Sequence, residues 1–182
     1  MRPPSVFGRA GRLPHMNVKL TWWEMLTAYH IASQRRVMNM QKGLAGRYGA
    51  PEKEGSEELD IVSTRGEMAV AKGLNLYWSG SVGDYGATDV GGIVEVRTRT
   101  KDWHALIVHP QDKDKAPYVL VDASQTPVFR LVGWVYGKDG KQQKFWSDPS
   151  GKNRPAFFID QVHLRPMDEL VGLLKAKTEY AW

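Results

Sequence analysis

The sequence contains no cysteine, which excludes disulfide bridges and zinc sites built from thiolates. It has no apolar run near the roughly 20 residues that cross a bilayer, so we expect no membrane partner. Residues 80–92 are rich in glycine but contain no Gly-Lys-Ser or Gly-Lys-Thr element, which excludes a nucleotide-binding P-loop. The residues around Ser81 lack the Gly-x-Ser-x-Gly pattern of an α/β-hydrolase nucleophile elbow. The lack of cysteine favours a cytoplasmic location.

The composition is that of a soluble globular domain, with 42% hydrophobic and 25% charged residues among 182. A net charge of +5 and a pI near 9.4 favour a polyanionic partner. Three arginines lie within residues 1–15, and without them 22 basic side chains stand against 20 acidic ones. We interpret residues 1–15, which lack the apolar core of a secretory signal, as a disordered leader. We expect residues 16–182 to form a single domain.

Two helices are predicted in the first half of the chain. Thr21-Trp22-Trp23-Glu24 is a capping box, and apolar residues recur at helical spacing from Trp22 to Met40, before Gly43 or Gly46 ends the helix. The second helix is expected from about Glu57 to Leu74. Its predicted buried stripe consists of Leu59, Val62, Gly66, Ala69, Val70 and Leu74.

Beyond residue 75 the pattern changes to short β segments, rich in Val, Ile, Tyr and Trp and separated by Gly, Pro and Asp. Gly137–Gly140 is a predicted turn, and Pro166 opens a predicted terminal helix, Met167–Lys177. This order predicts an α+β fold with helices packed on a central mixed β-sheet. The predicted strands are residues 76–79, 85–90, 93–100, 104–109, 117–122, 128–136 and 156–159.

The main candidate site combines Glu95 and Arg97 with Asp89. Side chains two apart in a strand point to the same face, so an acid and a cation project together from an otherwise apolar strand. Asp89 lies six residues earlier, before the Gly91-Gly92 turn. Buried charges are costly unless they are paired or hold a metal. With Glu67 on the preceding helix, these acids are typical of a Mg²⁺ site.

The position of Asp89 depends on the turn. A two-residue loop of Gly91-Gly92 pairs Asp89 with Val94 and turns it away from Glu95. A three-residue loop, Val90–Gly92, pairs Asp89 with Ile93 and places it on the face of Glu95. The site requires the second register, or an Asp89 within the turn itself, and Asp84 is the alternative ligand.

The order of these residues resembles the PD-(D/E)XK nuclease superfamily, which has the restriction-endonuclease-like fold. The match covers about residues 57–100: Gly66-Glu67 on the helix, Thr88-Asp89-Val90 at the strand end, and Glu95-Val96-Arg97 on the next strand. The segment from Asp89 to Gly137-Lys138-Asp139 also resembles a group of uncharacterised phage-encoded proteins. These resemblances imply a phage protein that acts in the host cytoplasm.

The superfamily resemblance implies a DNA endonuclease that is a Mg²⁺-dependent hydrolase, with Mn²⁺ as an alternative metal. Asp89 and Glu95 are the implied metal ligands, Glu67 an auxiliary ligand, and Arg97 the cation that faces the phosphate. Arg97 replaces the usual lysine and cannot act as a proton acceptor. The superfamily normally has a helix after this strand, whereas three further strands are predicted here after Glu95-Val96-Arg97. A catalytically inactive, nuclease-like module that binds nucleic acid or protein is the alternative function.

Further residues are candidates for nucleic-acid binding. Arg99 shares the strand face of Glu95 and Arg97, and Lys101 follows it, so both are predicted to contact the DNA backbone. Arg35 and Arg36 lie on a basic helix face with the same expected role.

Three tryptophans, Trp22, Trp23 and Trp134, are expected in the core, whereas Trp78, Trp103 and Trp146 lie beside predicted turns. The acidic turn His109–Asp114 is interpreted as a solvated loop. If the protein cuts both strands of DNA, a homodimer is the expected oligomeric state.

Overall fold

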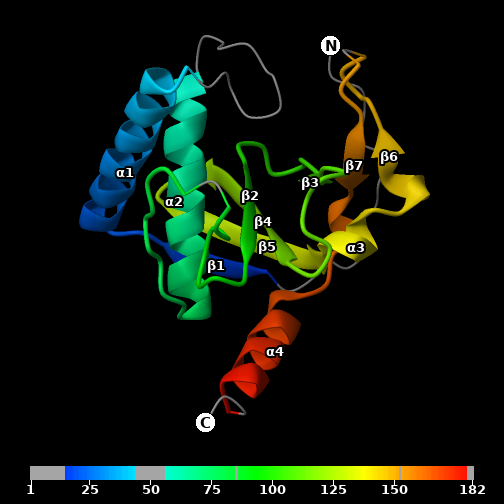
Figure 1. Ribbon diagram of the computed structural model, residues 1–182. Coiled ribbons are helices and arrows are strands. Elements are labelled where there is room, and N and C mark those ends of the chain that lie inside the picture. The colour runs from blue at the N-terminus through cyan, green and yellow to red at the C-terminus, as the bar shows by residue number, and fades with distance from the viewer. Residues whose placement is uncertain (1–14, 44–55, 85, 152, 180–182) are drawn as a thin grey trace.

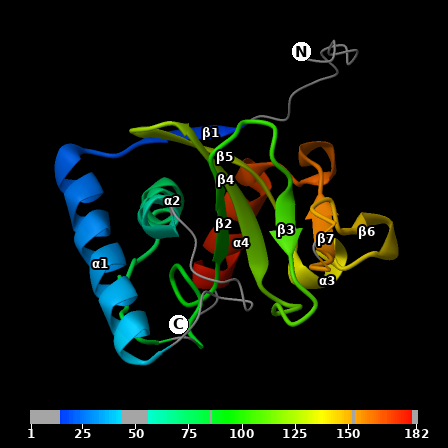
Figure 2. The same cartoon turned by 90° about the horizontal axis from the view of Figure 1, so that it is seen from above.

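The computed structural model describes residues 15–43, 56–84, 86–151 and 153–179. The elements form successive layers (Figures 1 and 2). Helix α1 (Trp22–Gln41) is outermost, and α2 (Ser56–Leu74) lies between α1 and a four-stranded sheet. A three-stranded sheet covers the opposite face of the four-stranded one. The α+β architecture predicted from the sequence is therefore confirmed.

The larger sheet is mixed. Its order is β1 (Met16–Lys19), β5 (Val128–Tyr136), β4 (Pro117–Gln125) and β2 (Glu95–Arg99). The strands pair antiparallel, except that β2 runs parallel to β4. The smaller sheet has the order β3 (Leu106–Val108), β7 (Ala156–Ile159) and β6 (Trp146–Ser147). Strand β2 thus forms one edge of the larger sheet.

Local sequence signals explain the helix ends. The Thr21 hydroxyl accepts a hydrogen bond from the Glu24 amide at 3.3 Å, and the Glu24 carboxylate accepts one from the Thr21 amide at 2.6 Å. This is the predicted capping box. Gly43 follows the C-cap with φ +60°, a conformation that favours glycine. Residues 44–55, with Gly46, lie outside the described residues, as do residues 1–14 of the predicted leader.

Several predicted elements differ in the structure. Residues 76–79 and 85–90 form no strand among the described residues. Leu76 and Trp78 instead pack against the larger hydrophobic cluster, and Val90 makes a single β-bridge with Val94. The expected turn at 137–140 is a short helix, α3 (Gly137–Gly140), and the terminal helix α4 extends over Met167–Glu179. Strands β1 and β6 were not predicted. Two 3₁₀ turns, Gln143–Phe145 and Gln161–His163, complete the described elements.

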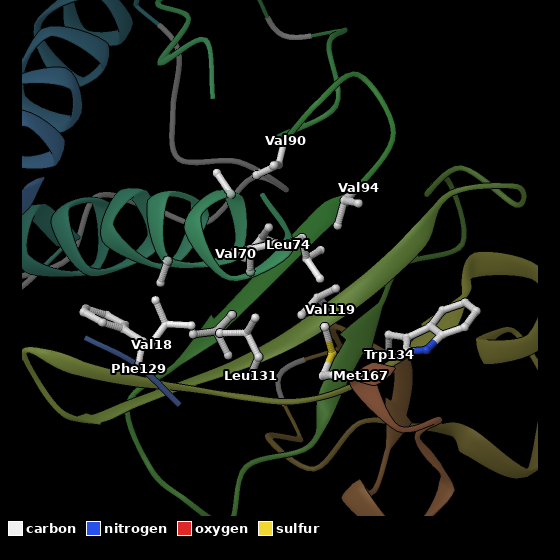
Figure 3. Close-up of a cluster of buried hydrophobic side chains, with 14 of the residues drawn as sticks. Val18, Val70, Leu74, Val90, Val94, Val119, Phe129, Leu131, Trp134 and Met167 are labelled. Atoms are coloured by element: carbon white, nitrogen blue, oxygen red, sulfur yellow. The ribbon is translucent and has the colours of Figure 1, made fainter. Parts of the chain in front are cut away.

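The hydrophobic core has one cluster on each face of the larger sheet. The cluster on the α2 side, in which Val70, Leu74, Val119, Leu131 and Trp134 meet, also includes Met167 of α4 (Figure 3). The second cluster fills the space between the two sheets. Trp134 is buried as expected, but Trp22, Trp23 and Leu59 are exposed, so the prediction that they are core residues was wrong.

Helix α2 approaches β2 very closely at Gly66. A Cβ atom at this position would lie 1.9 Å from Oγ1 of Thr98 and 3.0 Å from its Cβ and Cγ2. Glycine is therefore required by the helix–strand contact itself. The contact fixes the position of the next residue, Glu67, relative to β2.

No helix among the residues that the structure describes is long and apolar enough to span a membrane.

Candidate functional site

The turn between Asp89 and Glu95 adopts neither of the two expected registers. Val90 and Val94 exchange two backbone hydrogen bonds of 3.0 Å, so the loop is Gly91–Ile93. Gly91 and Gly92 have φ values of +59° and +68°, in the left-handed region that favours glycine. The bridge brings Asp89 opposite Glu95. The side chain of Asp89 accepts a hydrogen bond of 2.7 Å from the Val96 amide on the free edge of β2.

Glu95 begins β2 and is almost completely buried. Neighbouring Val96 packs in the α2-side cluster, so the alternation of the strand turns Glu95 to the opposite face. Its Oε1 accepts a hydrogen bond of 3.0 Å from Nζ of Lys113, which also donates to the Gly86 carbonyl. Burial and the charge of Asp89 raise the pKa of Glu95, against the opposing effect of Lys113.

Glu67 is a buried residue of α2 rather than a solvated one. Nη1 of Arg35 donates to both carboxylate oxygens, at 2.8 and 3.0 Å, and the Trp78 indole donates at 3.2 Å. Burial raises the pKa of Glu67, even though the bonds from Arg35 act in the opposite direction. Because the position lies only at the edge of the apolar stripe, the sequence pattern alone could not show this burial.

Asp89 connects the two glutamates electrostatically, since its charge raises the pKa of both Glu67 and Glu95. Asp89 therefore lies near enough to both glutamates to influence them, although Glu67 belongs to α2 and Glu95 points to the opposite face of β2. Among the described residues, however, no three acidic or histidine side chains converge closely enough to form a preformed metal cage. Mg²⁺ commonly uses one or two carboxylates with water and substrate phosphate. Asp89 and Glu95 are the pair that fits this mode.

Arg97 points into a structural network. Its guanidinium donates to Asp112 at 2.7 Å and to the carbonyls of Ile107 and Val96 at 3.2 Å, and lies 4.8 Å from the centre of the Tyr118 ring. Arg97 pairs with Asp112, and Glu95 pairs with Lys113. The cation nearest to the candidate metal ligands is therefore Lys113.

The side chain of Asp112 is largely covered, with 8% of its surface exposed, which corrects the interpretation of His109–Asp114 as an entirely solvated loop. Burial would raise the pKa of Asp112, but Arg97 and the His109 amide together lower it. Lys113 follows directly and thereby reaches Glu95. No local motif marks Lys113 in the sequence, because its place beside Glu95 depends on the path of the chain from β3 to β4.

The other predicted site residues are either bound to neighbouring side chains or exposed to solvent. Arg35 is bound to Glu67 and the Ser81 carbonyl, and Arg36 pairs with Asp60 at 3.1 Å. Asp84, the alternative ligand, is exposed and accepts weak hydrogen bonds from the amides of residues 86 and 87. Lys101 is exposed.

Arg99 and Arg65 have no counter-ion among the residues that the structure describes. Within the described part of the chain, neither guanidinium forms an ion pair, and the buried Nε atom of each has no hydrogen-bond partner. Burial lowers the pKa of both groups. Arg99 was predicted to contact nucleic acid, whereas Arg65 was missed, although it directly precedes the Gly66-Glu67 element. Both lie next to the Gly66–Thr98 contact.

The raised pKa of Glu95 predicts a pH effect on the metal-free protein. The folded state holds a proton at Glu95 more tightly than the unfolded state, so this contribution to stability is present at acidic pH and is lost as the pH rises through the raised pKa. Glu95→Gln removes the charge but keeps an oxygen acceptor for Lys113. We expect the variant to have a higher free energy of unfolding than the wild type at neutral pH.

Urea unfolding in EDTA at several pH values from 5 to 8 measures this effect, and the difference between the variant and the wild type should grow with pH. A variant that is less stable than the wild type at neutral pH would show that the ion pair with Lys113 outweighs the cost of burying Glu95.

Comparisons with known proteins identify no relative, since no family model, curated protein or solved structure matches the chain.

Proposed function

We propose that the protein is a metal-dependent nuclease that hydrolyses DNA phosphodiester bonds, on a variant of the restriction-endonuclease-like fold. The observation that carries the proposal is the pair of acids Asp89 and Glu95 on either side of a glycine turn, with Lys113 hydrogen-bonded to Glu95. Together with the sequence resemblance, this favours a phage-type enzyme acting in the host cytoplasm.

The chemistry of the acids fits Mg²⁺, or Mn²⁺ in its place. Asp89 and Glu95 offer hard oxygen ligands, and the raised pKa of Glu95 reflects a carboxylate that lacks full compensation for its charge. A divalent ion bound there would polarise the scissile phosphate and lower the pKa of an attacking water. Lys113 is positioned to neutralise charge that develops on the phosphate. Glu67, which Arg35 holds in place, is an auxiliary acid.

Arg99 favours a path for the DNA backbone along β2. Glu95 and Arg99 are separated by four residues of an extended strand, or about 13 Å, and point to the same face. Arg65 lies on α2, which covers the other face of β2, and Lys101 is exposed beyond Arg99. A DNA strand placed with one phosphate at the acids would pass the Arg99 guanidinium, and phosphate would supply a counter-ion for it.

One observation favours the alternative, a catalytically inactive module that binds nucleic acid. Arg97 occupies the position of the usual lysine and is held by Asp112. If Lys113 does not perform the role that this lysine has in the superfamily, the same surface binds DNA without cleaving it.

Incubation of the full chain with DNA tests the proposal. Supercoiled plasmid, single-stranded and branched oligonucleotides are each combined with Mg²⁺, Mn²⁺ or EDTA. We expect cleavage with metal, none in EDTA, and none by a variant carrying Asp89→Asn and Glu95→Gln together. Salt-sensitive DNA binding without cleavage in either metal would establish the binding module instead. Cleavage that persists in the double variant would refute the assigned ligands.

A further inference from the structure

Helix α1 carries an apolar stripe along one flank of its solvent-exposed side. The inner face is built from small or buried side chains: Met25, Ala28 and Ala32. Trp22, Leu26, Tyr29, Ser33, Val37 and Met40 follow one another at intervals of three or four residues, which places them on a single face of the helix. Of these, Trp22 is 79% exposed, Val37 55% and Met40 64%. Figures 1 and 2 show α1 at the outer side of the molecule.

We propose that this outer face of α1, which we call the α1 stripe, is the interface of a homodimer. In this dimer the α1 helices of two copies pack antiparallel. The proposal is independent of the nuclease assignment, because the α1 stripe contains none of the residues that surround β2.

The spacing of the α1 stripe suits a second helix. Intervals of three and four residues along 20 residues are the pattern of a two-helix seam. The pattern is also nearly symmetric about residue 31. In an antiparallel pair, Trp22 therefore faces Met40 of the second copy, Leu26 faces Val37, and Tyr29 faces Ser33. Each large side chain meets a smaller one, whereas a parallel pair would stack Trp22 on Trp22 and leave the helices splayed.

The size of the α1 stripe is appropriate for a dimer. Its apolar side chains, with the adjacent Trp23 at 77% exposure, present on the order of 700 Å² to solvent. A standard interface buries about 800 Å² on each partner, and a contiguous apolar patch of this size is unusual on a monomer.

The charge distribution favours a second copy over a nucleic acid or an acidic partner. The α1 stripe contains no charged residue, and uncharged Thr27, Gln34 and Gln41 flank one side of it. On the other side, Arg36 is already paired with Asp60. Two copies can therefore approach without repulsion between like charges, while phosphate would find no cation on this face.

Sedimentation equilibrium of the full chain tests the interface. We expect a mass of twice 20.5 kDa at micromolar concentration. Leu26→Glu and Val37→Glu each place a charge in the α1 stripe and should weaken dimerisation at least tenfold. Val162→Glu is the matched control, because Val162 is 79% exposed outside the stripe, and it should leave the mass unchanged. A monomeric wild type, or a dimer unaffected by both stripe variants, would overturn the proposal.

Cross-linking tests the orientation, since the natural chain has no cysteine. In an antiparallel pair, a double variant with Trp22→Cys and Met40→Cys forms a disulfide between copies, and Met40→Cys alone forms none. The two positions are about 27 Å apart along one helix, so a bond within the chain is excluded. Cross-linking of the Met40→Cys single variant would contradict the antiparallel arrangement.

Discussion

For the proposed nuclease, replacing Lys113 by methionine is expected to slow metal-dependent DNA cleavage by about 10²- to 10³-fold, the usual cost of removing one preorganised electrostatic contact from an active site. The reason is geometric: Nζ of Lys113 lies 3.0 Å from Glu95, whereas the Arg97 guanidinium is bonded to Asp112 and two backbone carbonyls. Single-turnover cleavage of a labelled oligonucleotide in saturating Mg²⁺ separates this loss from weaker DNA binding.

Lys115 supplies the matched control, since it lies two residues further along the same loop and is exposed. Lys115→Met should keep the wild-type rate within about threefold, well below the loss of a preorganised charge. The variant Arg97→Lys should lose stability, because a lysine cannot reproduce the forked contacts with Asp112 and the carbonyls, but it should retain cleavage. If Lys113→Met cleaves normally while Arg97→Lys changes the rate, the cation of the site is Arg97.

Gly66→Ala is expected to lower the free energy of unfolding by about 2–3 kcal/mol, a typical cost of overpacking a tight contact. The new methyl group would lie 1.9 Å from Oγ1 of Thr98 and 3.0 Å from two of its carbons, so no rotation of the threonine can accommodate it. Helix α2 must move away from β2, which takes Glu67 away from Asp89. Urea unfolding measures the loss of stability, and the cleavage rate should fall with it.

Gly172 of α4 is the appropriate comparison, because a Cβ at this helical glycine would meet no atom within 4 Å. Gly172→Ala should raise stability by about 0.5–1 kcal/mol through helix propensity alone. A second test combines Gly66→Ala with Thr98→Ala, which removes two of the three close atoms and should restore part of the loss. Equal effects of alanine at positions 66 and 172 would show that the α2–β2 distance is not limiting.

The sequence predicted the features that local signals determine. The capping box at Thr21 and Glu24, the glycine at position 43 and the proline before α4 each act on their own neighbours in the chain. The predicted helices therefore begin and end close to their structural bounds. The strongly apolar strands β4 and β5 were also found, because burial on both faces gives continuous runs of Val and Leu.

Features that depend on distant pairing were missed or misplaced. Strand β1 has four residues and exists because β5 pairs with it. Trp22 of the α1 stripe was assigned to the core because helical periodicity identifies an apolar face but not what covers it. The residues of the candidate site were predicted to lie together through their order, yet the partners of Glu95 and Arg97 depend on Asp112 and Lys113, which reach them only through the folded path of the chain.

The hydrogen bond from the Val96 amide to Asp89 has a consequence for solubility. Strand β2 ends the sheet, and an open strand edge is a template for pairing with another chain. Here the backbone amide of Val96 donates to Asp89, and the backbone carbonyl of Val96 accepts from Arg97. These two groups are therefore not available to pair with a strand of another chain. Asp89 thus occupies one hydrogen-bonding position on this edge. A substitution at this position that removes the oxygen acceptor is expected to free the Val96 amide for pairing with another chain.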